Sequence, residues 1–177
     1  MVESNNKVTK YSSSSSYFIF EAIFASIILA AIGYSIFSST DSIFIKTITV
    51  TFSLLILASI AFYLRSIVFS IFFYDSEIVI DFHLKSQKTK LNYTEMVGIK
   101  YISVQKSPDM NRIYFKTRNG KKSKKFQAVA FDDEFIEFID WLKSKNPKIE
   151  VSVIPSDHYL NEKMFGPKYK KYIKKTL

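Results

Sequence analysis

The sequence predicts an α+β membrane protein, in which a two-helix transmembrane hairpin precedes a small antiparallel sheet capped by a C-terminal α-helix. Two long apolar runs, at residues 17–38 and 43–64, predict the hairpin. Short alternating apolar stretches that begin near residue 67 predict the sheet. One amphipathic stretch at residues 132–145 predicts the capping helix. The chain therefore divides at about residue 67 into a membrane part and a sheet domain.

The first apolar run has 22 residues and a single charge, that of Glu21. As a helix it would be about 33 Å long, enough to cross a hydrocarbon core of about 30 Å. In the second run, 18 uncharged residues follow Lys46, whose long side chain can reach the headgroups. Only residues 39–42 separate the two runs, so we expect a tight transmembrane hairpin within residues 17–66.

The distribution of basic residues predicts the orientation of this hairpin. Lys7 and Lys10 precede the first run, Arg65 and many lysines follow the second, and only Lys46 lies near the turn. Because basic residues accumulate on the cytoplasmic side, we expect both termini in the cytoplasm of a multi-pass protein of the cell's inner, cytoplasmic membrane. A cleavable signal peptide is the alternative for the first run, but its apolar run is long and no clear cleavage site follows.

Residues 67–154 have the pattern of a small sheet domain, and two further segments flank the folded parts of the chain. Asn119–Gly120 is typical of a two-residue type I′ turn and predicts a hairpin. In the helix, Asp132 is expected as the N-cap, and the apolar face comprises Phe135, Phe138, Ile139 and Leu142. We expect a flexible, serine-rich segment at 1–16 and a basic tail at 155–177. The expected strands are 67–74, 77–84, 88–93, 98–105, 111–117, 121–129 as the return of the hairpin, and 148–154.

A small antiparallel sheet closed by one C-terminal helix is the plan of a pleckstrin-homology-like (PH-like) barrel. The chain resembles small bacterial membrane proteins in which two transmembrane helices precede a PH-like domain. The resemblance covers about 17–145, in the order of elements, in FFYDSEIVIDF (72–82) and in LNYTEMVGI (91–99). Tyr93, Glu95 and Met96 match the family's step between strands. It implies a membrane-anchored adaptor or regulatory module and supplies no catalytic residues.

No pattern of residues in the chain predicts a catalytic, cofactor or metal site. The chain has no cysteine, and His83 and His158 are far apart in the sequence. The carboxylates at 132–134 are explained by their place at a helix start, and the four glycines are isolated from one another. We therefore expect a non-enzymatic protein without a cofactor or a metal.

The basic residues are the strongest functional signal. Residues 1–74 carry four basic and three acidic side chains, which leaves +8 of the formal net charge of +9 on residues 75–177. Three interpretations stay open: a solvated sheet edge, anionic lipid headgroups, and nucleic acid, against which the small number of arginines argues. The lipid-contact candidates are Lys85, Lys88, Lys90, Arg118, Lys121, Lys122, Lys124, Lys125, Lys168, Lys170, Lys171, Lys174 and Lys175.

The sequence thus predicts a membrane-anchored interaction or scaffold module that contacts anionic lipids or recruits a protein. Its partners would be the membrane, anionic lipids, another protein or a second copy of the chain. The alternative is an accessory subunit of a membrane enzyme or transporter, with the hairpin making the contact. The small positions expected to carry that contact are Ala25, Ala30, Ala31, Gly33, Ala58 and Ala61.

Overall fold

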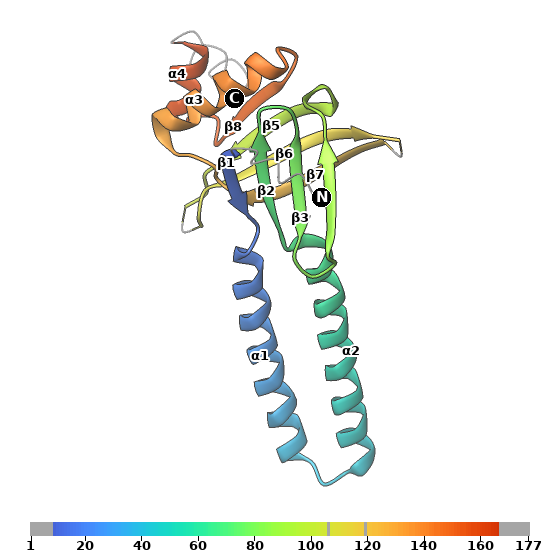
Figure 1. Ribbon diagram of the computed structural model, residues 1–177. Helices are drawn as coiled ribbons and strands as arrows, with labels where there is room; N and C mark the ends of the chain where they lie inside the picture. Colours follow the sequence, from blue (N-terminus) through green and yellow to red (C-terminus); the bar gives the residue numbers. More distant parts are fainter. Residues whose placement is uncertain (1–8, 106, 119, 167–177) are drawn as a thin grey trace, which may run out of the picture. The chain divides into compact units, whose positions relative to one another are not determined.

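The computed structural model describes residues 9–105, 107–118 and 120–166 of the 177-residue chain, and it has the predicted α+β composition (Figure 1). Two long helices are followed by strands and by two shorter helices. Over the described residues the strands form two four-stranded sheets and no closed barrel. The predicted succession of two long apolar helices, several strands and a further helix is therefore confirmed, whereas the strand at Thr9–Ser14 and the short helix at Tyr159–Phe165 were not predicted.

The two long helices are α1 (Tyr17–Ser39) and α2 (Ile43–Ile67), joined by a three-residue connection. Neither helix has a buried residue, and both are apolar around their whole circumference. Each is long and apolar enough to cross a membrane, with mean hydropathies of 2.0 and 2.1 over their most apolar stretches. The second helix continues three residues beyond its predicted end at residue 64.

Ser15 joins the beginning of α1 to the end of α2, although it lies in a serine run that predicts a flexible segment. Its hydroxyl group donates to the carbonyl oxygen of Ile67 at 2.5 Å and accepts the backbone N–H of Phe69 at 2.8 Å. Its own N–H donates to the carbonyl oxygen of Phe69 at 2.9 Å. Ser15 is completely buried, so water cannot replace these partners.

We expect the substitution Ser15→Ala to destabilise the protein by about 1–3 kcal/mol, because it removes the acceptor of a buried N–H group. Thermal unfolding of the full chain in detergent micelles, followed by circular dichroism, measures the effect. Ser12→Ala is the matched control, since Ser12 is exposed in the same serine run. An equal unfolding temperature for the two variants would contradict this role of Ser15.

The first sheet has the strand order β1–β2–β3–β4 and begins before the helices. Residues predicted to be flexible form β1 (Thr9–Ser14), which corrects that expectation, because β1 is held as the sheet neighbour of β2 (Phe69–Tyr74). The sheet continues with β3 (Ile78–Phe82) and β4 (Gln87–Leu91). The helical hairpin is therefore inserted between two neighbouring strands of one sheet, β1 and β2.

The second sheet has the strand order β7–β6–β5–β8 and is mixed rather than purely antiparallel. Its strands are β5 (Met96–Ile102), β6 (Met110–Thr117), β7 (Gly120–Gln127) and β8 (Glu150–Ile154), the last of which pairs parallel to β5. The predicted hairpin is present, but Gly120 pairs with Thr117, so the connection is shifted by one residue. Gly120 has φ +102°, a conformation that favours glycine.

Helix α3 (Asp132–Lys145) buries the predicted face of Phe135, Phe138, Ile139 and Leu142. The aromatic ring of Phe138 lies 5.1 Å from that of Phe73 on β2, which in turn lies 6.3 Å from that of Phe126 on β7. Asp132 is the first helical residue, with φ +51°, and the N-cap is Phe131, which makes no side-chain capping bond. The short helix α4 (Tyr159–Phe165) follows β8.

Candidate functional site: a cationic sheet face

Three basic side chains lie in one row across three neighbouring strands of the second sheet. Lys100 on β5 pairs with Arg112 on β6, and Arg112 pairs with Lys125 on β7. Paired residues of neighbouring strands point to the same face of a sheet. The row continues to Ser152 on β8, the partner of Lys100 on its other side. Three cations are therefore adjacent on one face, although they come from residues up to 25 positions apart in the sequence.

The same face carries two further lysines toward the end of the β6–β7 hairpin. Lys116 pairs with Lys121, and both side chains are exposed. The ammonium group of Lys121 lies 5.1 Å from the ring centre of Tyr114, which stands on this face between the two groups of cations. We define the cationic face as the side chains of Lys100, Arg112, Lys116, Lys121 and Lys125.

The opposite face of the second sheet is apolar and forms part of the core. Ile113 and Phe126 are completely buried there, and Phe115 is 4% exposed. Lys122 pairs with Phe115, and Lys124 pairs with Ile113, so these two lysines point away from the cationic face. Side chains alternate along a strand, and the predicted group of hairpin lysines is therefore divided between the two faces.

Like charges placed directly opposite each other weaken a sheet. The pairs Lys100–Arg112, Arg112–Lys125 and Lys116–Lys121 are three such cases on one face. Lysines on β7, an edge strand of this sheet, have a structural explanation because they prevent edge-to-edge aggregation. Lys100 lies on β5, an internal strand, so protection of a sheet edge does not explain why a lysine is present at this position.

The other predicted basic residues are not part of the cationic face. Arg118 is exposed at the end of the β6–β7 hairpin. Lys85 lies in the turn after β3, where its ammonium group is 5.6 Å from the ring centre of Phe82. Lys88 and Lys90 lie on β4, and Lys90 forms an ion pair with Glu77 at 3.6 Å. The tail candidates Lys168, Lys170, Lys171, Lys174 and Lys175 lie outside the described residues.

Sequence reasoning missed Lys100, Arg112 and Lys116 as site residues. The available signal was the alternation in residues 98–105 and 111–117, where each of these three side chains is next to at least one apolar residue. Alternation gives the face of each residue within its own strand. Only the register between the strands, however, shows that the basic positions form a continuous row.

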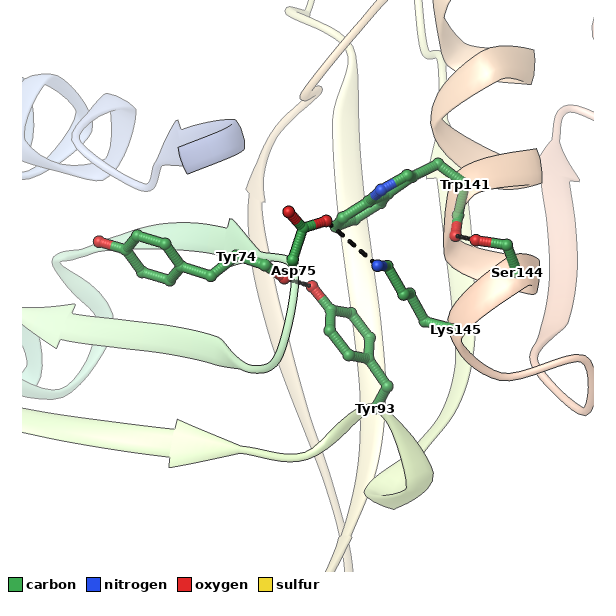
Figure 2. Close-up of polar contacts among 6 residues, drawn as sticks. All are labelled: Tyr74, Asp75, Tyr93, Trp141, Ser144 and Lys145. Carbon is green, nitrogen blue, oxygen red and sulfur yellow. Dashed lines mark hydrogen bonds and ion pairs between the residues drawn. The ribbon is translucent and has the colours of Figure 1, made fainter. Parts of the chain in front are cut away.

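The segment that carries the family resemblance has a structural role (Figure 2). The hydroxyl group of Tyr93 donates to the carbonyl oxygen of Tyr74 at 2.5 Å, and its ring meets the Trp141 ring edge to face. Lys145 forms an ion pair with Asp75 at 3.1 Å beside the same indole. Burial, assisted by the Asp75 carboxylate, raises the pKa of Tyr93, so its hydroxyl group remains a hydrogen-bond donor.

The other residues of that segment also support the local fold. The Glu95 carboxylate accepts the backbone N–H of Asn92 at 2.8 Å, which closes a capping box around a single helical turn. Met96 is 3% exposed. The segment thus anchors the chain beneath α3 at the point where β5 begins, and its side chains are used in packing.

The two histidines have separate local roles. His83 is exposed, and its Nε2 lies 2.9 Å from the hydroxyl oxygen of Ser70. His158 caps α4, since its Nδ1 accepts the N–H of Leu160. Among residues 9–105, 107–118 and 120–166, no group of histidine and carboxylate side chains is arranged to hold a metal ion.

The helical hairpin presents a groove of about 450 Å³ between α1 and α2. Of the small positions predicted for a membrane contact, Ala30 and Ala61 line this groove. At Gly33, an added Cβ would lie 3.2 Å from the Ser53 hydroxyl oxygen, so the helices approach closely there. The remaining lining is formed by Ile19, Ala22, Ile23, Ser26, Ile27, Leu57, Ile60 and Leu64.

Comparison of the chain with protein-family models and with curated proteins finds no match.

Proposed function

We propose that the chain is a non-enzymatic, membrane-anchored interaction module whose cationic face binds the anionic headgroups of its own membrane. The row of Lys100, Arg112 and Lys125 on three adjacent strands carries this proposal. Each basic residue near an anionic leaflet contributes about 1 kcal/mol of attraction. The five cations of this face can therefore act together, while the hairpin keeps them close to lipid.

The same proposal assigns the sheet domain to the PH-like type and the protein to the cytoplasmic membrane of a bacterium, with both termini in the cytoplasm. The order of helices and strands supports the resemblance, and the bias of basic residues supports the orientation. β1 leads into α1, and β2 follows α2. Because these two strands are neighbours in one sheet, both ends of the hairpin are expected on one side of the membrane.

Lysine acetylation of the full chain in lipid nanodiscs tests the lipid contact. We expect Lys100, Lys116 and Lys121 to be modified more slowly in discs rich in phosphatidylglycerol than in neutral phosphatidylcholine discs. The difference should fade as salt rises, because the Debye length falls from about 10 Å at 0.1 M to about 3 Å at 1 M. Lys148 is the internal control, since it is exposed and lies outside the cationic face.

Equal modification of the three lysines in both kinds of disc would show that this face is only solvated. The accessory-subunit function would then be preferred, because the groove between α1 and α2 gives the hairpin its own surface for a membrane partner.

A further inference from the structure

We propose that the row of Lys100, Arg112 and Lys125 selects phosphomonoester headgroups over phosphodiester headgroups. This inference rests on the proposed function and adds the chemical class of the lipid. Neighbouring strands are about 4.8 Å apart, so each lysine of the row starts one strand away from the central arginine. Three long, flexible cationic side chains can therefore converge on a single phosphate group.

The chemistry of the two headgroup classes differs in charge and in the number of free oxygen atoms. A phosphomonoester has three terminal oxygens and a charge of about −1.5 to −2 at neutral pH, with a second pKa of about 6. A phosphodiester has two free oxygens and a single negative charge. Three adjacent cations are neutralised better by the monoester, which also offers an oxygen to each of them.

Arg112 occupies the centre of the row, where its geometry matters most. A guanidinium group is a planar fork that binds two phosphate oxygens at once, whereas an ammonium group acts as a point charge. Lys100 and Lys125 flank it on β5 and β7, and all three residues are half-buried. Arg112 would thus orient the phosphate, and the two lysines would supply the additional charge.

On one side the row is flanked mostly by small residues, and the β8 backbone fills the space over one of them, Gly98. The next row on this face consists of Gly98, Tyr114 and Ser123, and two of these three residues are small. Gly98 must remain glycine, because a Cβ there would lie 2.8 Å from the carbonyl oxygen of Glu150. The exposed side chain of Glu150 lies on the same face, on β8. Its negative charge repels an anion, so the phosphate is expected to bind on the side of the row away from Glu150.

The headgroup of a lipid suits this row better than a soluble phosphate compound. The row lies on the face of a sheet, and a single phosphate on such a surface would be held weakly when free in solution. Attachment to a membrane raises the effective concentration of a tethered partner to about the millimolar range. A chain anchored by α1 and α2 meets headgroups at such concentrations.

Native mass spectrometry of the full chain, with equimolar phosphatidic acid and phosphatidylglycerol of identical acyl chains, tests the inference. At pH 7.5 we expect several-fold more adducts with phosphatidic acid. The preference should decline at pH 5, because the monoester regains its second proton below its pKa of about 6 while the diester is unchanged. Arg112→Lys should lose the preference at pH 7.5. Arg118→Lys, the matched control at an exposed turn, should retain it.

Each other outcome has a distinct meaning. Equal binding of both anionic lipids, above that of a neutral lipid, would overturn the selectivity and leave the proposed function intact. No excess over a neutral lipid would overturn both. A preference that persists in Arg112→Lys would place the selective site elsewhere. Displacement of the lipid by millimolar glycerol 3-phosphate would overturn the lipid assignment and show that the site binds a soluble metabolite. Displacement by a phosphopeptide at lower concentration would overturn it in favour of a protein.

Discussion

Replacement of Phe138 by alanine is expected to lower the free energy of unfolding of the sheet domain by about 3–5 kcal/mol. The side chain is completely buried, and its ring lies 4.8 Å from that of Tyr11 and 5.1 Å from that of Phe73. It also lies 6.2 Å from Phe135 and 6.4 Å from Trp141. Truncation would leave a cavity where β1, β2 and α3 meet, and would remove a large part of a typical stability of 5–15 kcal/mol.

The fluorescence of Trp141, the only tryptophan in the chain, follows this unfolding in detergent micelles as denaturant is added. Phe131→Ala is the matched control, because Phe131 precedes the same helix and is 55% exposed. Its unfolding midpoint should stay close to that of the parent chain. A similar midpoint for Phe138→Ala would contradict the placement of Phe138 at the centre of the core.

A fragment that begins at residue 75, where the positively charged part of the chain starts, is expected not to fold. Such a fragment lacks β1 and β2, and with them Ile71 and Phe73, which are completely buried. By contrast, a chain in which a short Gly/Ser linker replaces residues 17–66 should fold as a soluble domain. Ser15 and Phe69 are already joined by hydrogen bonds, so a short linker can connect their strands.

Amide proton spectra distinguish the two outcomes, since a folded sheet gives dispersed resonances and an unfolded chain does not. The linker variant supplies the matched control, because it contains the whole of 75–177 and adds only β1, β2 and the residues beside them. Dispersed spectra from the 75–177 fragment would show that the first two strands are dispensable. A collapsed spectrum from the linker variant would show that the helices are needed for folding.

The elements that the sequence predicted correctly are those whose signal is local. The apolar runs of α1 and α2 predict their own boundaries to within three residues, because the length of an apolar helix is set by the residues within it. The buried face of α3 follows from its spacing of four apolar residues, and the alternation from residue 69 onward predicts the strands in the same way.

The predictions that failed depended on partners far away in the sequence. The serine-rich segment has no apolar alternation, and it becomes β1 because β2, some 60 residues later, is its sheet neighbour. Ser15 is buried for the same reason, as its hydrogen-bond partners are the last residue of the second helix and a residue shortly after it. The shift of the 117–120 turn follows from the pairing of Gly120 with Thr117 in the strand ladder.

For the candidate site, the sequence by itself determined that residues 75–177 carry an excess of positive charge and that basic residues alternate with apolar ones. Only the tertiary structure decided which of them act together. Strand pairing places Lys100, Arg112 and Lys125 in one row and turns Lys122 and Lys124 to the opposite face. The physical reason is that a side chain's face is fixed within its own strand, whereas its neighbours on that face are fixed by hydrogen bonds to other strands.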